Sequence, residues 1–582
     1  MTESPSTGNP ALPVSREPMI AQTLKKRIRI CAGFAALPAF IICGRLFWLQ
    51  TFRHENLSAT ASREFNRTVS EIGPRGRVFG AGGELLTESI ISWDAGLFKK
   101  DLNEPARAVA GLSRVLSLPP SFPEKFRRAK NFVPLKRGLD RQTCEAVKAL
   151  KLKGVTLEPV QSRYYPSGDL ARSIIGITRA ERGLTGIELL YDKVLSGRVS
   201  RREVVHDAAG RVIFQDRLEK EARPRDLHLT IDKNIQYFAQ EALRKAVEKS
   251  RADLGMALVQ DPQSGRILAM AAWPLDVKKI EPVEWVYEPG STFKAILLAA
   301  ALEKGIVNEN SSFFCENGTW AFNSKVTLHD HEPEKTLTLS GVMERSSNIG
   351  TAKIGLKLGV KDFYLYTKAF GFGAKSGLGF HGESAGILRP LERFKQIDLA
   401  VGSYGHGIAV TPLQVLNAYS ALANGGRLYE PRLVEKITEF EGEEVFRNDP
   451  AVIRQVISPD ISGRVKAILR AVVEKGTGKN ALVPGYSIAG KTGTSKKIDP
   501  RTGQYLTGKT VASFAGFFPV PEPQYTVLVV LDNPTGLIYG GETAAPAFRE
   551  IAVKIINLKG LKSDAPLPRK TEDQTPARPI SD

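Results

Sequence analysis

Ser291 and Lys294 stand three residues apart in the segment YEPGSTFKAILLAAALEKG, a spacing suited to nucleophilic catalysis. Pro289 and Gly290 predict a turn, after which the serine opens a helix whose apolar run must be buried. Because residues three apart share a helix face, the lysine amine lies on the same side as the serine hydroxyl. Burial would lower the pKa of that amine, so that Lys294 could accept the serine's proton. The helix N-terminus would add backbone N–H groups where an oxyanion forms.

A serine before a helix is most often an N-cap, and an S-x-x-K spacing also arises by chance in a chain of 582 residues. Two further motifs follow it in order, SSN at Ser346 to Asn348 and KTGT at Lys491 to Thr494. Each stands in a suitable local context. The three motifs together favour an acyl-transfer site over a simple cap.

SSN follows the helical segment TLSGVMERS, so that a loop there would present the hydroxyl of Ser346 and the amide of Asn348. These groups could relay a proton and hold a substrate carbonyl, and an ordinary turn is the alternative. KTGT follows the run YSIAG and is typical of an edge strand. Gly493 would leave room for a substrate backbone, and Lys491 could bind a terminal carboxylate. An ordinary strand end is the alternative there.

The elements that must position these motifs begin near Leu227. The segment LHLTIDKNIQYFAQEALRKAVEKS predicts a strand that enters a helix capped by Asp232, with apolar residues at helical spacing. GMALVQDPQSGRILAMAAW predicts a hairpin, TVASFAGFFPV and QYTVLVVLDNP predict two more strands, and AAPAFREIAVKIINL predicts a last helix. Strands at both ends with helices between them indicate one sheet between helical layers.

The stretch from Ile30 to Leu49 is apolar, 20 residues long and carries one charge. As a helix it would span about 30 Å, the thickness of a bilayer's hydrocarbon core. Four basic residues precede it, so the positive-inside rule predicts a cytoplasmic N-terminus and an exported remainder. A buried soluble helix is the alternative. Cleavage or lipidation at Cys43 is disfavoured because bulky residues precede it, namely Phe40, Ile41 and Ile42.

Residues 51–225 contain short strand-like runs broken by Gly and Pro, followed by a basic section around SGRVSRREVVHDAAGR. They predict an extended, β-rich module. Residues 1–22 and the end of the chain are polar and rich in Pro, which predicts disordered tails. A chain of this length needs two or more domains.

The chain has 81 basic and 62 acidic residues, a net charge of +19. An excess of this size favours polyanions such as nucleic acid, anionic lipid or an acidic wall polymer. The sequence has no dense Lys/Arg stripe with interleaved aromatics, which disfavours nucleic acid.

Cysteines and histidines give little sign of a metal site or a disulfide. Cys144 and Cys315 lie far apart without a CxxC partner, which favours two separate buried thiols. His329 and His331 are a conceivable metal pair, but no third ligand is evident, so a loop role is favoured and no metal is predicted. For His406 a groove or packing role is favoured, because Lys294 already supplies a base.

STFK, SSN and KTGT in this order resemble the penicillin-binding protein and serine β-lactamase superfamily. The resemblance narrows to class B penicillin-binding proteins over most of residues 25–560, and no region is left for the glycosyltransferase domain of class A enzymes. The segments that carry it are PRGRVFGAGGELL, SRYYPSGDLARSIIG, GLTGIELLYDKVLSG, LTIDKNIQ, DPQSGRILAMA and SYGHGIAVTPLQV.

The resemblance implies an α/β protein with a single N-terminal transmembrane helix, a β-rich pedestal and a transpeptidase domain with an antiparallel sheet between helical layers. The expected boundaries are residues 1–29 for a cytoplasmic tail, 30–50 for the helix, 51–225 for the pedestal, 226–560 for the transpeptidase domain and 561–582 for a disordered tail. One departure is the run Gly80, Ala81, Gly82, Gly83, where the family usually has Asp-Arg-Asn-Gly.

The resemblance also implies the chemistry. Ser291 would be acylated by the D-alanyl-D-alanine end of a stem peptide, with Lys294 as general base and no cofactor. β-Lactams would bind the same site. The other implied roles are proton transfer and positioning by Ser346 and Asn348, contacts to the donor carboxylate by Lys491, Thr492 and Thr494 in the strand that contains Gly493, and an oxyanion hole made by the backbone N–H groups of Ser291 and Thr494.

Other functions remain open at the level of sequence. A β-lactamase usually has a Glu in an E-x-x-L-N loop, whereas Glu383 is followed by Ser-Ala-Gly-Ile. A membrane penicillin sensor or an idle scaffold would share the fold. Within class B, the size, the SYGHGIAVTPLQ segment and the brief pedestal favour the cell-division enzyme over the elongation enzyme. That enzyme works in the inner membrane beside a SEDS-family glycosyltransferase and other divisome proteins, with its catalytic domain outside the cytoplasm.

Overall fold

The computed structural model divides by contacts into two units, residues 1–71 with 199–221 and residues 72–198 with 222–582. Most of both predicted tails lies outside the described residues, although residues 561–566 are described. Helix α1 begins at Glu17, earlier than predicted. The structure describes residues 17–57, 66–72, 74–179, 182–196, 199–206, 212–217, 224–499 and 501–566.

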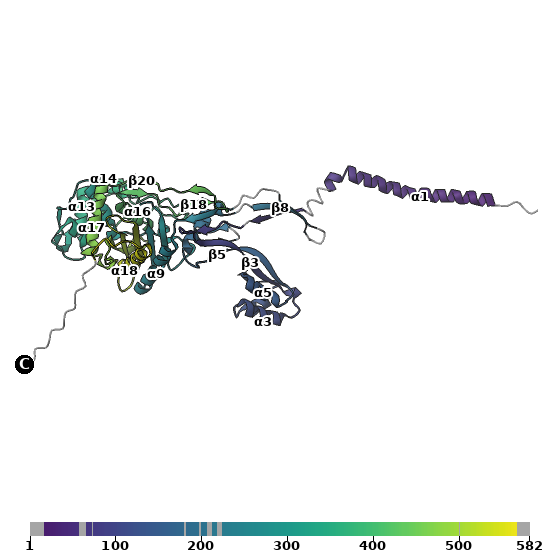
Figure 1. The fold of residues 1–582 in the computed structure, drawn as a ribbon, viewed down its shortest axis with the longest axis horizontal. Helices are drawn as coiled ribbons and strands as arrows, with labels where there is room; N and C mark the ends of the chain where they lie inside the picture. The colour runs from purple at the N-terminus through teal and green to yellow at the C-terminus, as the bar shows by residue number, and fades with distance from the viewer. Residues whose placement is uncertain are drawn as a thin grey trace, which may run out of the picture. The chain divides into compact units, whose positions relative to one another are not determined.

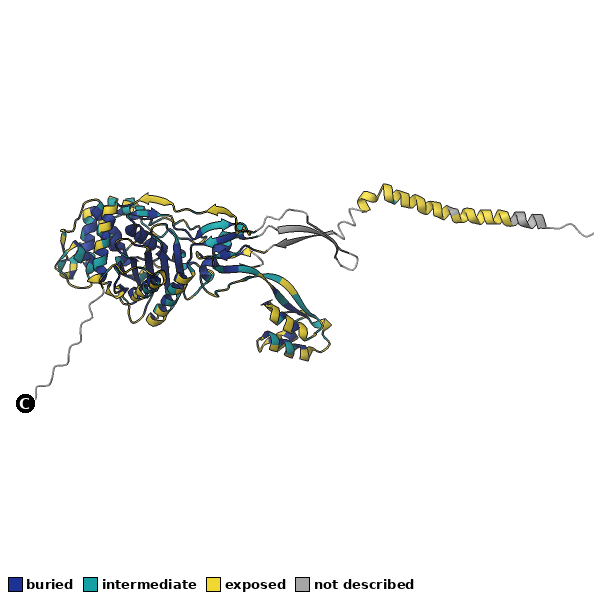
Figure 2. Ribbon diagram, viewed as in Figure 1, coloured by how far each residue is buried: buried dark blue, intermediate teal, exposed yellow. Residues whose placement is uncertain are grey.

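In the first unit, α1 (Glu17–Thr51) contains the predicted membrane segment. Its stretch Leu24–Thr51 has 28 residues and a hydropathy of 1.9, enough by length and composition to cross a membrane. No residue of its most apolar stretch is buried by other described parts of the protein, and Figure 2 shows the helix as exposed. This is contrary to the alternative of a buried soluble helix. The unit also contains a sheet of order β1-β8-β9, formed by β1 (Asn66–Ile72), β8 (Val199–His206) and β9 (Val212–Arg217).

In the second unit, the predicted antiparallel sheet is present with the strand order β12-β11-β23-β22-β21. The DPQSG turn joins its first two strands as expected. β21 contains KTGT and lies at the edge of this sheet, again as predicted. The strands are β11 (Leu254–Gln260), β12 (Ile267–Trp273), β21 (Ala489–Ile498), β22 (Tyr505–Phe518) and β23 (Tyr525–Asp532).

Helices cover both faces of this sheet (Figure 1). Side chains of β23 alternate between two cores: Leu528 faces the core that contains α11 (Lys294–Glu303) and α16 (Pro412–Ala423), and Val529 faces the core that contains α9 and α18. The expected layers are therefore confirmed. Helix α9 (Lys233–Ser250) is capped by Asp232, whose carboxylate accepts from Asn234 N and Ile235 N. Helix α18 is Ala544–Lys559.

The remaining elements of the transpeptidase part are short helices and two-stranded sheets. They are α10 (Glu281–Glu284), η2 (Gly290–Phe293), η3 (Glu316–Gly318), α12 (Leu339–Glu344), α13 (Asn348–Leu358), α14 (Val360–Ala369), η4 (Leu391–Arg393), α15 (Gln396–Gly402), α17 (Pro459–Glu474), η5 (Lys479–Ala481), β13 (Ser312–Phe314), β14 (Thr319–Ala321), β15 (Thr327–His329), β16 (Thr336–Thr338), β17 (Arg427–Tyr429) and β20 (Val452–Gln455).

A second sheet of seven strands has the order β19-β18-β10-β2-β3-β4, with β5 paired to β3. Strand β10 (Asp226–Leu229), predicted to open the catalytic domain, pairs with β18 (Val434–Thr438) on one side and with β2 (Val78–Phe79) on the other. Strands from both sides of residue 225 thus share one sheet. The others are β3 (Leu85–Phe98), β4 (Phe132–Leu139), β5 (Val155–Tyr164) and β19 (Glu444–Arg447).

The pedestal also contains helices that the sequence analysis did not predict. Those within residues 105–149 pack on β3 and β4 around a small core of their own. In the first of them, Ala108, Leu112 and Leu116 are buried on one helix face. That spacing is a helical signal present in the sequence. The helical elements are η1 (Lys99–Asp101), α3 (Pro105–Leu116), α4 (Phe122–Arg128), α5 (Arg141–Ala149), α6 (Arg172–Ile175), α7 (Gly186–Leu190) and α8 (Asp192–Leu195), with the short strands β6 (Thr178–Arg179) and β7 (Arg182–Gly183).

Three of the family-like segments meet in a buried ion cluster in the pedestal. Arg75 and Arg163 contact the two oxygens of the Glu188 carboxylate at 2.8 and 2.7 Å. Arg75 also contacts Asp192 at 2.6 Å, and the side chains of Arg75 and Glu188 are fully buried. Since loss of one partner would leave an uncompensated buried charge, these segments hold the pedestal together.

The run that departs from the family pattern forms the turn between β2 and β3. Gly83 adopts a φ of 80°, which favours glycine, and Ala81 N donates to Ile231 O at 2.8 Å. The turn is thereby tied to the segment that leads into α9. Its unusual sequence therefore still gives an ordinary hairpin.

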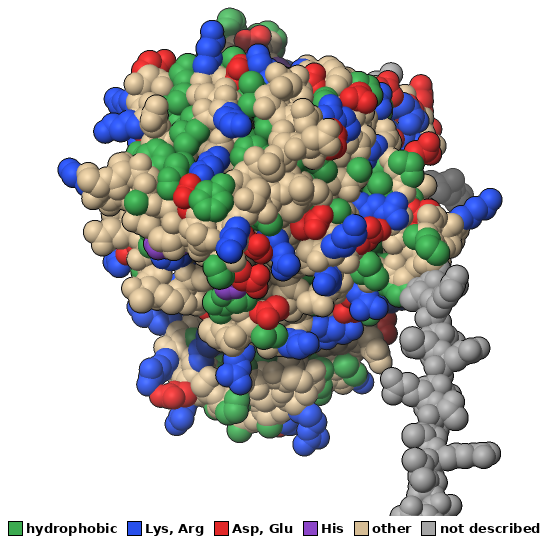
Figure 3. Space-filling model, turned by 90° about the vertical axis from the view of Figure 1, so that its left-hand side faces the viewer, with side chains coloured by type: hydrophobic (Ala, Val, Ile, Leu, Met, Phe, Trp, Pro, Cys, Tyr) green, Lys and Arg blue, Asp and Glu red, His purple; other side chains and the backbone are tan. Residues whose placement is uncertain are grey.

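Basic residues do not form a stripe on the face of the molecule seen in Figure 3. There, Lys and Arg side chains are scattered among Asp and Glu. On this face the excess positive charge is therefore dispersed, a distribution that does not favour a nucleic-acid track.

Candidate active site

Ser291 lies in the first turn of the η2–α11 helix, beside a close backbone contact. Gly290 has a φ of 54° and donates its N–H to Gly405 O at 3.2 Å. The N-cap position of η2 is Pro289 rather than the serine. The Ser291 hydroxyl instead accepts a hydrogen bond from Ser346 Oγ at 3.0 Å, so the simple cap interpretation does not hold.

Lys294 is fully buried and contacts the SSN motif. Its Nζ donates to Asn348 Oδ1 at 2.8 Å, to Ser346 O at 2.5 Å and to Ser346 Oγ at 3.2 Å. Burial above all, and then the charge of Lys491, holds the pKa of this amine well below its usual range. The lowered pKa makes this amine easier to deprotonate than an ordinary lysine, which is the direction that a proton acceptor requires.

Ser346 stands between the lysine and the nucleophile. The sequence analysis expected Lys294 to accept the proton of Ser291 from the same helix face, and the SSN loop to be able to relay a proton. Within the part of the chain that the structure describes, the hydrogen bonds run from Lys294 to Ser346 and from Ser346 to Ser291. When the two hydroxyls rotate so that the donor roles reverse, the same contacts offer a two-step path for the Ser291 proton to Lys294. Ser346 has a φ of 58°, a left-handed conformation that is unusual for serine.

Asp330 supports the SSN loop, a role that the sequence analysis missed. Its carboxylate accepts from Ser347 Oγ at 2.6 Å and from Ile349 N at 2.9 Å. Ser347 in turn caps α13 through Gly350 N. Asp330 directly follows β15 and lies 18 residues before α13, so no local signal shows this contact and only the fold brings its loop against α13.

The two flanking histidines make separate contacts. His329 O accepts from Asn348 Nδ2 at 2.9 Å, and the His331 ring packs against Tyr539 at 5.0 Å. Within the described residues, no group of three His, Cys, Asp or Glu side chains could hold a metal ion. The segment is thus a structural loop beside the site.

The KTGT motif lies against η2. Lys491 is fully buried, and burial lowers its pKa to about 7. Its Nζ donates to Thr492 Oγ1 at 3.3 Å, which also shares a hydrogen bond of 2.8 Å with Thr477. Thr494 Oγ1 accepts from Gly540 N at 3.2 Å. The strand thus presents an amine and two hydroxyls next to the nucleophile.

Gly493 has a packing role that the sequence analysis did not foresee. A Cβ at this position would lie 2.9 Å from Thr292 Cγ2 and 3.0 Å from Pro289 O. A Cβ on Gly290 would meet Thr494 O at 2.9 Å. The two glycines therefore allow the KTGT strand and the nucleophile turn to lie in direct backbone contact.

Glu288, three residues before Ser291, is a second residue that the sequence analysis missed. It is buried and joins three segments around the nucleophile. Its carboxylate accepts hydrogen bonds from Gly407 N at 2.7 Å and from Tyr505 Oη at 3.0 Å. Its backbone carbonyl accepts a hydrogen bond from Ser495 Oγ at 2.7 Å. Burial raises the pKa of this carboxyl.

His406 lies in the SYGHG loop beside these groups. Its ring contacts Tyr404 and Tyr505, with centroids 5.1 and 6.3 Å away. Burial, together with the charges of Lys294 and Lys496, lowers its pKa to about 4. A neutral ring packed on two tyrosines fits the packing role that was favoured for it.

Glu383 is not available as a hydrolytic base. Its carboxylate accepts hydrogen bonds from the Ser376 hydroxyl and from three backbone N–H groups, those of Ser376, Gly377 and Gly379. The buried side chain organises its own loop. This agrees with the absence of the β-lactamase motif.

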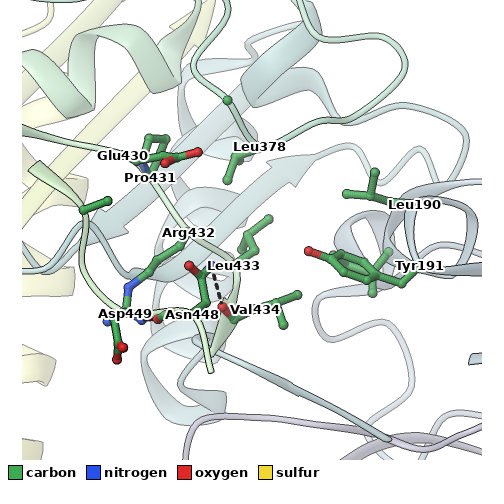
Figure 4. Close-up of a pocket in the computed structure, with 13 residues that line it drawn as sticks. Leu190, Tyr191, Leu378, Glu430, Pro431, Arg432, Leu433, Val434, Asn448 and Asp449 are labelled. Carbon is green, nitrogen blue, oxygen red and sulfur yellow. Dashed lines mark hydrogen bonds between the residues drawn. The ribbon is translucent and has the colours of Figure 1, made fainter. Parts of the chain in front are cut away.

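A pocket of 170 Å³ lies away from the motifs, between α7 and residues 430–434 (Figure 4). Asn448 Nδ2 donates to Val434 O across its floor. None of the eight predicted site residues lines it. The candidate active site is instead the region around the half-buried Ser291, where all three motifs meet.

Known families match both parts of the chain. The penicillin binding protein transpeptidase domain matches residues 255–552, and the penicillin-binding protein dimerisation domain matches residues 70–229. Stage V sporulation protein D of Bacillus subtilis is 31% identical over 94% of this chain and 88% of its own length. This chain is a class B penicillin-binding protein.

Other relatives agree with this assignment. Peptidoglycan D,D-transpeptidase FtsI of Escherichia coli is 29% identical to this class B penicillin-binding protein, and the alignment covers 94% of each of the two chains. A crystal structure of penicillin binding protein 3 from Mycobacterium tuberculosis, complexed with aztreonam, is 26% identical, with a TM-score of 0.66 over 85% of this chain and 99% of that one. The protein is thus a peptidoglycan D,D-transpeptidase of the serine type.

The pKa of Lys491 predicts how donor recognition depends on pH. The amine is charged below pH 7 and neutral above it, so its attraction for a donor carboxylate weakens as pH rises through about 7. We expect kcat/KM for a carboxylate-bearing donor to fall there relative to kcat/KM for the matching donor amide. Activity towards both donors also requires deprotonation of Lys294, which has the opposite pH dependence. That effect is the same for both donors and cancels in the ratio. A constant ratio between about pH 6 and about pH 9 would contradict a carboxylate-binding role for Lys491.

Proposed function

We propose that this protein cross-links peptidoglycan stem peptides through an acyl-enzyme at Ser291, in septal wall synthesis. The observation that carries the chemistry is the hydrogen-bonded line from Ser291 through Ser346 to the buried amine of Lys294. A serine hydroxyl is a weak nucleophile, and a neutral amine at the end of this line supplies the missing base.

In the first half-reaction, Ser291 Oγ attacks the carbonyl carbon of the penultimate D-alanine. The serine proton passes to Ser346 Oγ, whose own proton passes to Lys294. The peptide bond then breaks, and the terminal D-alanine leaves as an amine after taking the proton from Lys294. In the second half-reaction, an acceptor amine attacks the ester carbonyl and gives up a proton to Lys294. The C–Oγ bond breaks, and that proton passes through Ser346 to the Ser291 oxygen. One amide is thus exchanged for another.

The remaining site residues hold the donor. Lys491, Thr492 and Thr494 bind its carboxylate, and Asn348 orients its backbone. The N–H groups of Ser291 and Thr494 stabilise the oxyanion, and the close approach of Gly290 to the Thr494 carbonyl supports this assignment. Gly493 keeps the two segments together.

The protein acts outside the cytoplasm as a single-pass inner-membrane protein. The apolar helix α1 supports the anchor, and the basic residues before the apolar stretch favour a cytoplasmic N-terminus. A septal enzyme would act beside a SEDS-family glycosyltransferase and other divisome proteins. The similarity to FtsI favours this role, and the similarity to a sporulation protein is a reason to test the alternatives directly.

The chemical part of the proposal predicts one covalent adduct with a labelled β-lactam. Intact-mass spectrometry should detect it on the wild type and on the control Ser340→Ala, because the Ser340 hydroxyl donates to Glu344 on the same helix. Ser291→Ala should remain unlabelled, because it lacks the attacking oxygen. The wild type should also convert a stem-peptide thioester and an amine into an amide. Labelling of Ser291→Ala would refute the nucleophile, whereas labelling without amide formation would indicate a penicillin sensor.

The cellular part of the proposal is tested by depletion of the protein. A septal transpeptidase is needed for division but not for elongation, so depleted cells should grow into filaments. The phenotype should be rescued by Ser340→Ala and not by Ser291→Ala. Cells that round up instead would indicate the elongation-specific role.

A further inference from the structure

We propose that a hollow between α14, α16, β17 and β20 is a second binding site, which takes a small organic anion carrying a carboxylate or phosphate group. The hollow has a volume of 220 Å³ and contains none of the predicted catalytic or substrate-binding residues. Its walls include apolar side chains, and its rim is basic.

A fixed hydrogen-bond donor lies in this hollow. Asn417 lines it although the residue is only 8% exposed. Its Oδ1 accepts from Gln260 Nε2 at 2.9 Å, and Gln260 Oε1 accepts from Ser420 Oγ at 2.6 Å. This chain fixes the amide, so that Nδ2, which has no hydrogen-bond partner among the described residues, is directed into the hollow. The N–H groups of Nδ2 are accessible from the hollow, and a ligand oxygen could accept a hydrogen bond from them.

The rim carries three basic side chains, Lys368, Lys375 and Arg454. None of them forms an ion pair with another residue that the structure describes. No Asp or Glu lines the hollow, and the carboxylate of Glu383 beside Ser376 is already saturated by four donors. The unbalanced positive charge therefore favours an anion.

The wall and the volume limit the ligand. Phe370, Leu428 and Ile453 line the hollow, so an apolar part of the ligand would be buried there. A volume of 220 Å³ is smaller than the roughly 300 Å³ at which drug-sized sites begin. The ligand is thus a small group, either a free metabolite-sized anion or the headgroup of an anionic lipid.

The pocket in Figure 4 lacks these features. It is lined by Glu430 and Asp449 as well as by Arg432. The guanidinium of Arg432 already donates to Ser264 O and Asn448 O. With two carboxylates and an occupied cation, that pocket does not favour an anion, which distinguishes the two cavities.

The test uses the full chain in nanodiscs of zwitterionic lipid, titrated calorimetrically at low salt with inorganic phosphate and with butanoate. We expect saturable binding of one equivalent. Asn417→Asp, which places a negative oxygen at the donor position, should weaken binding at least about tenfold. Lys368→Glu with Lys375→Glu should weaken it by a similar factor. The control Lys361→Glu, on α14 but outside the hollow, should change it less than about twofold.

Two outcomes would overturn the proposal: no saturable binding of either probe, or equal affinity in the control and in the double lysine variant. Penicillin labelling and thermal unfolding check that each variant is folded. If Asn417→Asp fails this check, the double variant carries the test alone, because both lysines are exposed. Nanodiscs containing phosphatidylglycerol distinguish the sources: they suppress butanoate binding if the natural ligand is a lipid headgroup, and leave it unchanged if the ligand is free in solution.

Discussion

The burial of the Lys294 amine is the constraint on which the catalytic site depends. A buried ammonium without a counter-ion is costly, so the fold favours the neutral amine that catalysis needs. Burial is achieved because α11 is apolar on all sides and lies within a core. The groups around the amine are supplied by one loop, in which Ser346 and Asn348 accept its hydrogen bonds. Asp330 fixes that loop from the far side, and its charge also limits how far the lysine pKa falls.

A second constraint is the close packing of three backbone segments around Ser291. Gly290, Gly405 and Gly493 let the nucleophile turn, the SYGHG loop and the KTGT strand approach without side chains between them. Glu288 then ties the same segments together through hydrogen bonds to Gly407, Tyr505 and Ser495. Because Lys491 lies on the edge strand, its position is set by the whole central sheet. The helices on both faces thus contribute to the site indirectly, by holding that sheet.

The sequence was sufficient to predict those parts of this arrangement that are determined by neighbouring residues. Three short motifs, the central strands, the Asp232 cap and the apolar α1 all have signals within a few neighbouring residues, and the structure contains them. It was not sufficient for contacts that depend on tertiary placement. Nothing near Asp330 or Glu288 indicates which loops they will meet, and the insertion of Ser346 between Lys294 and Ser291 depends on a left-handed residue. The partners of β10 were likewise unpredictable, since a single strand does not specify its sheet. The pedestal helices are different, because Ala108, Leu112 and Leu116 carry a helical period that the sequence analysis overlooked.

The most direct test of this account is the titration of Lys294 itself. The protein is labelled with carbon-13 at the lysine side chains, and the Lys294 signal is assigned by its absence from Lys294→Ala. We predict that the signal titrates well below the ordinary lysine value of about 10.4, because burial disfavours the charged amine. A Lys294 signal that titrates at the ordinary value would contradict the central claim, because the amine would then be protonated and unable to accept the proton of Ser291.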